Sequence, residues 1–206
     1  ATSTAAIMRG IYVSNGIDSI AGNTVRNMTC ATASSGSGNS ASITGISNFS
    51  SIVGANWIRA NTVHSLVNSN NSVALHINGI YYNGPSSGAG GVIEKNLVHS
   101  LTSPSTLASV NGITAGGQTA SYQNNMVRLG LDATGADIAT TTPYNGFLEI
   151  AGTNTVLHNT VYIGGTVSGT GATSPTYAYN NNATLTSTRI IRNNIFINAR
   201  GNSTTG

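Results

Sequence analysis

The stretch Ile20-Ala21-Gly22-Asn23-Thr24-Val25 contains the pattern that decides the fold: an apolar residue, two variable residues, Asn, one variable residue, then Val or Ile. Five further stretches repeat it: IRANTV (58–63), IEKNLV (93–98), YQNNMV (122–127), VLHNTV (156–161) and IIRNNI (190–195). The six motif asparagines are Asn23, Asn61, Asn96, Asn125, Asn159 and Asn193, and they recur every 29–38 residues. A period of this length is typical of a solenoid, in which each repeat stacks on its neighbour.

A Gly followed by a large apolar residue precedes each copy of the Asn motif. The pairs are Gly10-Ile11, Gly45-Ile46, Gly79-Ile80, Gly112-Ile113 and Gly146-Phe147, with Ala178-Tyr179 as a variant. Stretches rich in Gly, Ser, Thr and Asn, such as 31–40, separate the repeats and indicate loops. Each repeat is thus predicted to hold three short strands, paired in parallel with the next coil about 4.8 Å along the axis. We predict an all-β chain, a single right-handed parallel β-helix domain of about six coils over residues 1–206.

The motif Asn is expected to form a sharp corner between two strands. Asn tolerates left-handed backbone conformations better than other non-Gly residues, and stacked amides can bond along the column. The positions three before and two after each Asn are apolar in all six copies, so we expect them to face the interior.

By strand alternation, the residue three positions after each Asn is expected to face outward. These residues form a candidate ligand or contact column: Arg26, His64, His99, Arg128, Tyr162 and Phe196. Such a column is either an ordinary solvated ladder or a platform for sugars or for another chain.

Composition supports an ordered all-β chain with few charges. Charged residues make up 6% of the chain and hydrophobic residues 39%, so it does not have the charge-rich, apolar-poor character of a disordered segment. The formal net charge of +3 comes from scattered Lys and Arg, which argues against a nucleic-acid or anionic-membrane surface. The single cysteine, Cys30, cannot form an internal disulfide and is expected to be a small core residue.

The Asn motif, in all six copies, resembles the repeat of pectate-lyase-like right-handed β-helix proteins. The closing stretch IIRNNIFINARGNSTTG (190–206) is similar to β-helical regions of large surface and secreted proteins of Bacteroidetes-type bacteria. The resemblance implies the β-helix fold over the whole chain and a secreted, cell-surface location. It carries over no catalytic residue, because no position here matches the catalytic residues of the lyases.

Catalysis has little support in the sequence. A glycosidase needs two facing carboxylates, and a calcium-dependent lyase needs several acids on one patch with a base nearby. The five acids (Asp18, Glu94, Asp132, Asp137 and Glu149) fall at unrelated positions of the repeat. Asp132 and Asp137 share a loop, and His64 and His99 lie one coil apart without a third metal ligand. We therefore expect no enzyme activity, no cofactor and no metal.

The sequence favours a non-catalytic structural or adhesive module of a bacterial surface or filament protein. Its expected partners are further coils or other copies of the same protein, and surface glycans, but neither nucleic acid nor a membrane. The alternatives are a polysaccharide-binding or polysaccharide-cleaving β-helix and a lectin-like binder that uses the outward column. Asp18-Ser19-Ile20 also resembles an acidic-Ser-aliphatic O-glycosylation site, with Ser19 as the acceptor.

Overall fold

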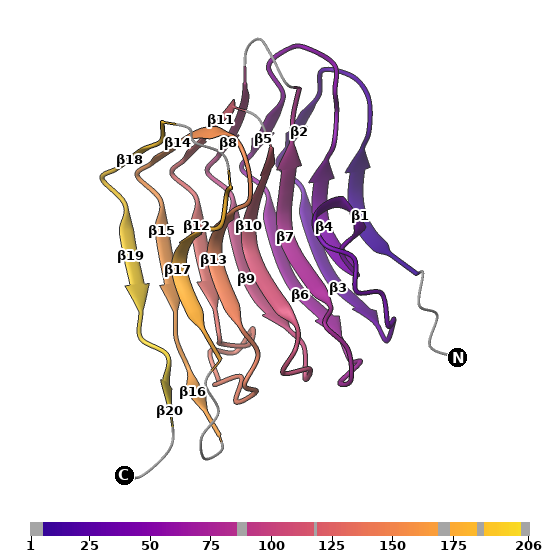
Figure 1. Cartoon of the computed structure of the whole chain (residues 1–206), viewed down its shortest axis with the longest axis vertical. Helices are drawn as coiled ribbons and strands as arrows, with labels where there is room; N and C mark the ends of the chain where they lie inside the picture. Colours follow the sequence, from indigo (N-terminus) through magenta and orange to yellow (C-terminus); the bar gives the residue numbers. More distant parts are fainter. Residues whose placement is uncertain (1–5, 86–89, 118, 169–173, 185–187, 203–206) are drawn as a thin grey trace.

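The chain winds through three parallel β-sheets, as the repeat predicts. A computed structural model describes residues 6–85, 90–117, 119–168, 174–184 and 188–202. Figure 1 shows the coils following one another along one axis, with β1 (Met8–Val13) and β19 (Ile195–Asn198) at opposite ends. Each of the three sheets has six strands, close to the predicted number of coils, and every pairing within them is parallel. The parallel β-helix prediction is confirmed.

Each coil contributes one strand to each of the three sheets. The first sheet contains β1, β4 (Ile43–Asn48), β7 (His76–Asn83), β10 (Ser109–Gly117), β13 (Tyr144–Glu149) and β17 (Thr176–Asn181). The second contains β2 (Ser19–Ala21), β5 (Trp57–Arg59), β8 (Gly91–Glu94), β11 (Thr119–Gln123), β14 (Thr153–Leu157) and β18 (Ile190–Arg192). The third contains β3 (Thr24–Cys30), β6 (Thr62–Asn68), β9 (Leu97–Thr102), β12 (Met126–Leu129), β15 (Thr160–Ile163) and β19.

Two short elements lie outside these sheets. β16 (Thr166–Val167) pairs in parallel with β20 (Gly201–Asn202), and a short 3-10 helix, η1 (Gly38–Ser40), lies in the loop before β4. No helix in the described ranges is long and apolar enough to cross a membrane.

The glycine of the Gly–apolar motif lets the first and third sheets approach each other closely. A Cβ built on Gly79 would lie 2.6 Å from the carbonyl oxygen of Gly112 and closer still to the side chain of Val98. Gly45 has the same relation to the carbonyl of Gly79, and the other motif glycines repeat it. The glycine is therefore required for packing, because the valine of the Asn motif fills the space that a side chain on the glycine would occupy.

The corner between the second and third sheets is made by the residue that precedes each Asn, and not by the Asn itself. That residue has a left-handed backbone in all six coils, with φ between 53° and 68°: Gly22, Ala60, Lys95, Asn124, His158 and Asn193. The expectation that the motif Asn takes the left-handed conformation is therefore wrong at five of the six predicted positions. The sixth, Asn193, does take it, because Asn194 follows it as the residue that bonds to Asn159 in the last coil. The Asn serves the corner through its side chain.

The asparagine ladder, formed by Asn23, Asn61, Asn96, Asn125, Asn159 and Asn194, runs along the corner. In each of the five links, the backbone N–H and Nδ2 of one Asn both donate to Oδ1 of the next, at 2.8–3.1 Å. The second Nδ2 hydrogen of Asn61, Asn96, Asn125, Asn159 and Asn194 reaches a backbone carbonyl of the preceding coil. The ladder therefore satisfies polar groups that the corner removes from water.

The sixth member of the ladder is Asn194, which corrects the predicted Asn193. In β19, Ile195 pairs with Thr160 and Phe196 with Val161, so the last coil is shifted by one residue from the predicted alignment. Its repeat is Ile191 to Phe196. The sequence fits both alignments, and a one-residue slip turns every side chain to the opposite face. Ile190 and Ile195, expected inside, are accordingly exposed.

Candidate functional site

The outer face of the third sheet carries the predicted outward column. Strand register places Arg26, His64, His99, Arg128 and Tyr162 side by side on β3, β6, β9, β12 and β15. The sixth position belongs to Ile197, which is exposed, and not to the predicted Phe196. From here on, the outer column is Arg26, His64, His99, Arg128, Tyr162 and Ile197.

Phe196 packs inside because of the register shift. Its ring stacks on Tyr179 with centroids 5.6 Å apart, and Tyr179 stacks in turn on Phe147 at the same distance. Phe147 meets the buried Tyr122 edge to face at 4.9 Å. These aromatic rings fill the interior of the last coils, so Phe196 serves the core and is not a surface contact residue.

His64 and His99 form a stacked pair at the centre of the outer column. Their ring centroids lie 4.8 Å apart and the ring planes are inclined by 2°. Nδ1 of each ring lies within hydrogen-bond distance of the hydroxyl of the next residue, at 3.0 Å for Ser65 and 2.7 Å for Ser100. Both serines have a left-handed backbone, with φ of 56° and 58°. Each ring is therefore oriented by a contact with the neighbouring residue of its own strand.

Burial and, to a smaller extent, positive neighbours lower the pKa of both histidines. For His64 the first cause is desolvation and the second is the charge of Arg26. For His99 desolvation again leads, followed by the charges of His64 and Arg128. The pair is therefore mostly neutral at pH 7 and becomes doubly charged only in more acidic solution.

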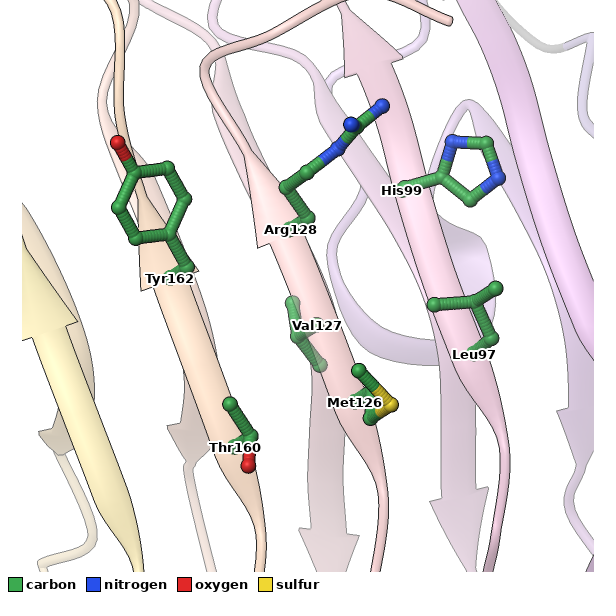
Figure 2. Close-up of a pocket in the computed structure, with 7 residues that line it drawn as sticks. All are labelled: Leu97, His99, Met126, Val127, Arg128, Thr160 and Tyr162. Atoms are coloured by element: carbon green, nitrogen blue, oxygen red, sulfur yellow. The ribbon is translucent and has the colours of Figure 1, made fainter. Parts of the chain in front are cut away.

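A shallow groove of about 440 Å³ lies beside the outer column. Figure 2 shows His99, Arg128 and Tyr162 in one row and Leu97, Met126 and Thr160 in a second row on the same three strands. Met126 is 56% exposed and adds apolar surface to the groove. Arg128 Nη2 donates to the backbone oxygen of Asp132 at 2.9 Å, which holds the guanidinium at the edge of the groove. The groove combines an apolar floor with a cationic edge.

Glu149 is used in local structure. Glu149 is fully buried, and its carboxylate pairs with Arg189 Nε at 2.6 Å. It also accepts from Asn154 Nδ2 at 2.8 Å and from the Tyr179 hydroxyl at 2.5 Å. Burial, followed by this bond to Glu149, raises the pKa of Tyr179.

Asp132 and Asp137, the closest candidate pair, do not form a carboxylate pair. Asp132 Oδ1 accepts from Thr134 and from the backbone N–H of Ala136 within its own loop. Asp137 Oδ2 accepts from the backbone N–H of Thr166. In the part of the chain that the structure describes, no group of three His, Cys, Asp or Glu side chains is placed to hold a metal ion.

The second sheet carries a cation beside an acid on adjacent coils, and the candidate glycosylation site. Arg59 and Glu94 are register partners there, but Glu94 accepts from Gln123 Nε2 at 2.9 Å, whereas the Arg59 guanidinium lies over the Trp57 ring at 5.5 Å. Ser19, the candidate glycosylation site, is the first residue of β2 and is exposed.

The sequence reasoning missed a polar groove on the outer face of the first sheet. This amide groove, about 310 Å³, is built on a second ladder in which Asn111 donates to Asn78 at 3.0 Å and Asn145 donates to Asn111 at 2.8 Å. Asn180 extends the ladder at 2.8 Å, and His76 lines the groove. The sequence contains a pattern that could have indicated this groove, because Asn-Gly recurs at 78–79, 111–112 and 145–146. Asn-Gly usually indicates a turn, and here it lies within strands.

No family model, curated protein or solved structure matches this chain. The fold therefore stands on the repeat and the geometry alone. What the chain does has to be argued from its own surfaces.

Proposed function

We propose that this chain is a non-catalytic structural β-helix module of an extracellular surface or filament protein. The observation that carries the proposal is the asparagine ladder, which joins all six coils through paired hydrogen bonds from Asn23 to Asn194. A rod whose coils are tied along one corner resists bending and local opening, because opening one coil breaks the bonds of two neighbours.

The hydrogen-bond pattern at the two outermost described coils supports the partners that we propose, namely further coils or other copies of the same protein. Among the described residues, Oδ1 of Asn23 accepts no hydrogen bond and the backbone N–H of Asn194 donates none. Ile191 occupies an interior position yet is 43% exposed. One end of the ladder thus offers an acceptor and the other a donor beside apolar surface, which suits head-to-tail stacking.

Incubation with a panel of neutral and uronate-containing polysaccharides tests the non-catalytic role. We expect no release of new chain ends or unsaturated products over many hours. Turnover that disappears in the Asp132→Asn or Asp137→Asn variant would overturn the proposal in favour of a polysaccharide-cleaving β-helix.

A parallel sedimentation experiment over a range of concentrations is expected to show end-to-end association that Ile191→Lys weakens.

The amide groove favours a second function, the binding of a neutral sugar chain. Amide and hydroxyl groups such as those of Asn111, Asn145 and Ser109 match the uncharged donors and acceptors of sugars. A glycan array with the His76→Ala and Asn180→Ala variants tests this function. Binding that both variants abolish would support it, and an array without any bound neutral glycan would remove it.

A further inference from the structure

We propose that Asn15-Gly16, in the turn between β1 and β2, is a site of spontaneous covalent modification. The backbone nitrogen of Gly16 displaces the side-chain amide of Asn15, and water then opens the ring to aspartate or isoaspartate. The inference goes beyond the structural role and does not depend on it, because it concerns an exposed turn and not the asparagine ladder. It rests on the exposure, the hydrogen bonds and the backbone of this turn.

Five Asn-Gly pairs are candidates for this reaction. They lie at 15–16, 78–79, 83–84, 111–112 and 145–146. Gly favours the reaction because it has no side chain to cover its backbone nitrogen. The ring closes when the side-chain carbonyl carbon of Asn comes within about 3–3.5 Å of the next backbone nitrogen, in line for attack. The fold therefore decides which of the five pairs reacts.

Three of the pairs are held away from this geometry by the first sheet. Asn78, Asn111 and Asn145 lie within β7, β10 and β13 and are at most 6% exposed. Their side chains form the hydrogen-bonded row of the amide groove, which fixes each amide toward the neighbouring coil. Ring closure would turn the following peptide out of its strand and break the pairing with the coils on both sides.

The fourth pair, Asn83-Gly84, is shielded by tyrosines. The Asn83 side chain bonds to the Tyr81 hydroxyl, and its Oδ1 lies against the backbone of Gly117. Gly84 is buried, and a Cβ there would collide with the Tyr82 ring. Both the amide and the nitrogen that would attack it are therefore confined.

Asn15-Gly16 is free of such restraints. Asn15 is exposed, and among the described residues its side chain makes no hydrogen bond and the backbone N–H of Gly16 donates none. Gly16 has a φ of 103°, which L side chains rarely adopt, and a Cβ there would lie 3.1 Å from Asp18 Oδ2. The turn therefore requires glycine at the position whose nitrogen attacks.

The chain beyond the reactive bond is anchored without the help of Asn15. Ser50 Oγ donates to the carbonyl oxygen of Gly16 at 2.6 Å, and the backbone N–H of Asp18 donates to Asn56 Oδ1 at 2.9 Å. The Asn15 side chain can thus turn toward the nitrogen while its surroundings stay in place. We expect the product to keep the fold and to carry one new carboxylate, which lowers the formal net charge by one, from +3 to +2.

The reaction consumes only water. A bond forms between the Gly16 nitrogen and Cγ of Asn15, the Cγ–Nδ2 bond breaks, and the proton of the attacking nitrogen leaves with the amide as ammonia. Hydrolysis of the five-membered ring at Cγ gives aspartate. Hydrolysis at the backbone carbonyl carbon gives isoaspartate, whose main chain runs through Cβ and Cγ. Because the attacking nitrogen must lose its proton, the rate should rise with pH.

Peptide mapping by mass spectrometry tests the proposal. The folded protein is kept at 37 °C and pH 8 for several weeks, and each Asn-Gly peptide is followed for replacement of the amide NH2 by OH. We expect Asn15 to react at least about tenfold faster than Asn78, Asn111 or Asn145, since misplacing reacting atoms by about 1 Å can cost about a hundredfold in rate. Equal rates at Asn15 and Asn111 would overturn the proposal.

Unfolding provides the first control. In guanidinium chloride, with loss of structure verified by circular dichroism, the rates at the five pairs should converge, because every Asn-Gly can then close its ring. A preference for Asn15 that persists in the unfolded chain would mean that the flanking residues and not the fold select the site, which contradicts the argument above.

Asn15→Gln provides the second control. It keeps an amide in the turn, but attack by the Gly16 nitrogen would now need a six-membered ring, so acidic species should no longer accumulate on isoelectric focusing. Asn70→Gln, where Asn and not Gly follows, should accumulate them as the wild type does. Equal melting temperatures verify that both variants fold. Acidic species that form in Asn15→Gln at the wild-type rate would overturn the proposal and leave the structural role untouched.

Discussion

Asn96 donates from both its backbone N–H and its Nδ2 to a single oxygen, Oδ1 of Asn125, at 3.1 and 2.9 Å. The two residues are 29 positions apart in sequence, and they form one link of a ladder in which four of the six members are buried. Repeated from coil to coil, these hydrogen bonds form a continuous polar ladder along the corner of a chain that has few charged residues.

Asn96→Ala is expected to destabilise the protein by more than about 2 kcal/mol. The change leaves the donors of Asn61 and the carbonyl of Ile58 without their partner, and each buried unsatisfied group costs about 1–3 kcal/mol. Urea unfolding followed by circular dichroism measures the change. Asn15→Ala, in the exposed turn after β1, serves as control and should stay within about 0.5 kcal/mol of the wild type. Equal stabilities for the two variants would contradict the role of the ladder.

Gly79→Ala is expected to cost about 1–3 kcal/mol, the usual range for overpacking a filled interior. The added methyl group would meet both the Gly112 carbonyl and the Val98 side chain. Gly201→Ala is the matched control, because a Cβ there has no heavy atom within 4 Å. Thermal melts of the two variants compare them directly. A Gly79→Ala protein as stable as the control would show that the sheets can move apart without cost.

Stability is expected to fall as the pH drops from about 6.5 toward 5. The folded-state pKa values of His64, His99 and His76 are lowered, so the unfolded chain binds protons in this range more readily than the folded chain. The histidine contribution is fully present above the unfolded-state pKa and is lost as the pH falls through the folded values. Urea unfolding at pH 7.5, 6.5 and 5.0 follows it.

The double variant His64→Gln with His99→Gln measures how much the stacked pair contributes to the pH dependence of stability. The stability of this variant should depend less on pH but should still fall in acid, because burial lowers the pKa of His76. Asp132, whose pKa is lowered by hydrogen bonds within its loop, titrates in a more acidic range and does not disturb this window. An unchanged slope of unfolding free energy against pH would mean that protonation of the stacked pair does not affect stability.

Arg189→Leu is expected to destabilise the protein by about 3–5 kcal/mol, because it leaves the buried carboxylate of Glu149 without its counter-charge. Arg59→Leu is the comparison, since Arg59 is exposed and its guanidinium lies over the Trp57 ring in a cation–π arrangement worth about 0.5–1 kcal/mol. Calorimetric melts of the two variants test the difference. Similar melting temperatures would show that water reaches Glu149 when the arginine is removed.

The sequence predicted the coil architecture because two motifs recur together and constrain different sheets. It could not choose the alignment of the last coil, since Ile190-Ile191 and Asn193-Asn194 satisfy the motif in both registers. Only the pairing of Phe196 with Val161, and the aromatic stack that it completes on Tyr179, decides between them.

The corner conformation was also hidden from the sequence. The left-handed residue is Gly, Ala, Lys, His or Asn in different coils, so no residue type marks it. Most of the outer column was correctly placed by strand alternation, whereas its hydrogen bonds to Ser65 and Ser100 depend on backbone bends that the motif does not encode.

Disulfide trapping between coils tests the stacking and its register most directly. In a Cys30→Ser background, Thr160→Cys with Ile195→Cys joins two outward register partners, whose spacing of about 4.8 Å falls within the range that a disulfide spans. We expect rapid and complete cross-linking of this pair under mild oxidation, and of Thr62→Cys with Leu97→Cys in the middle of the third sheet. Thr160→Cys with Asn194→Cys should remain unlinked. Cross-linking of Thr160 with position 194 but not 195, or failure of the middle pair to cross-link, would contradict the in-register β-helix on which the account rests.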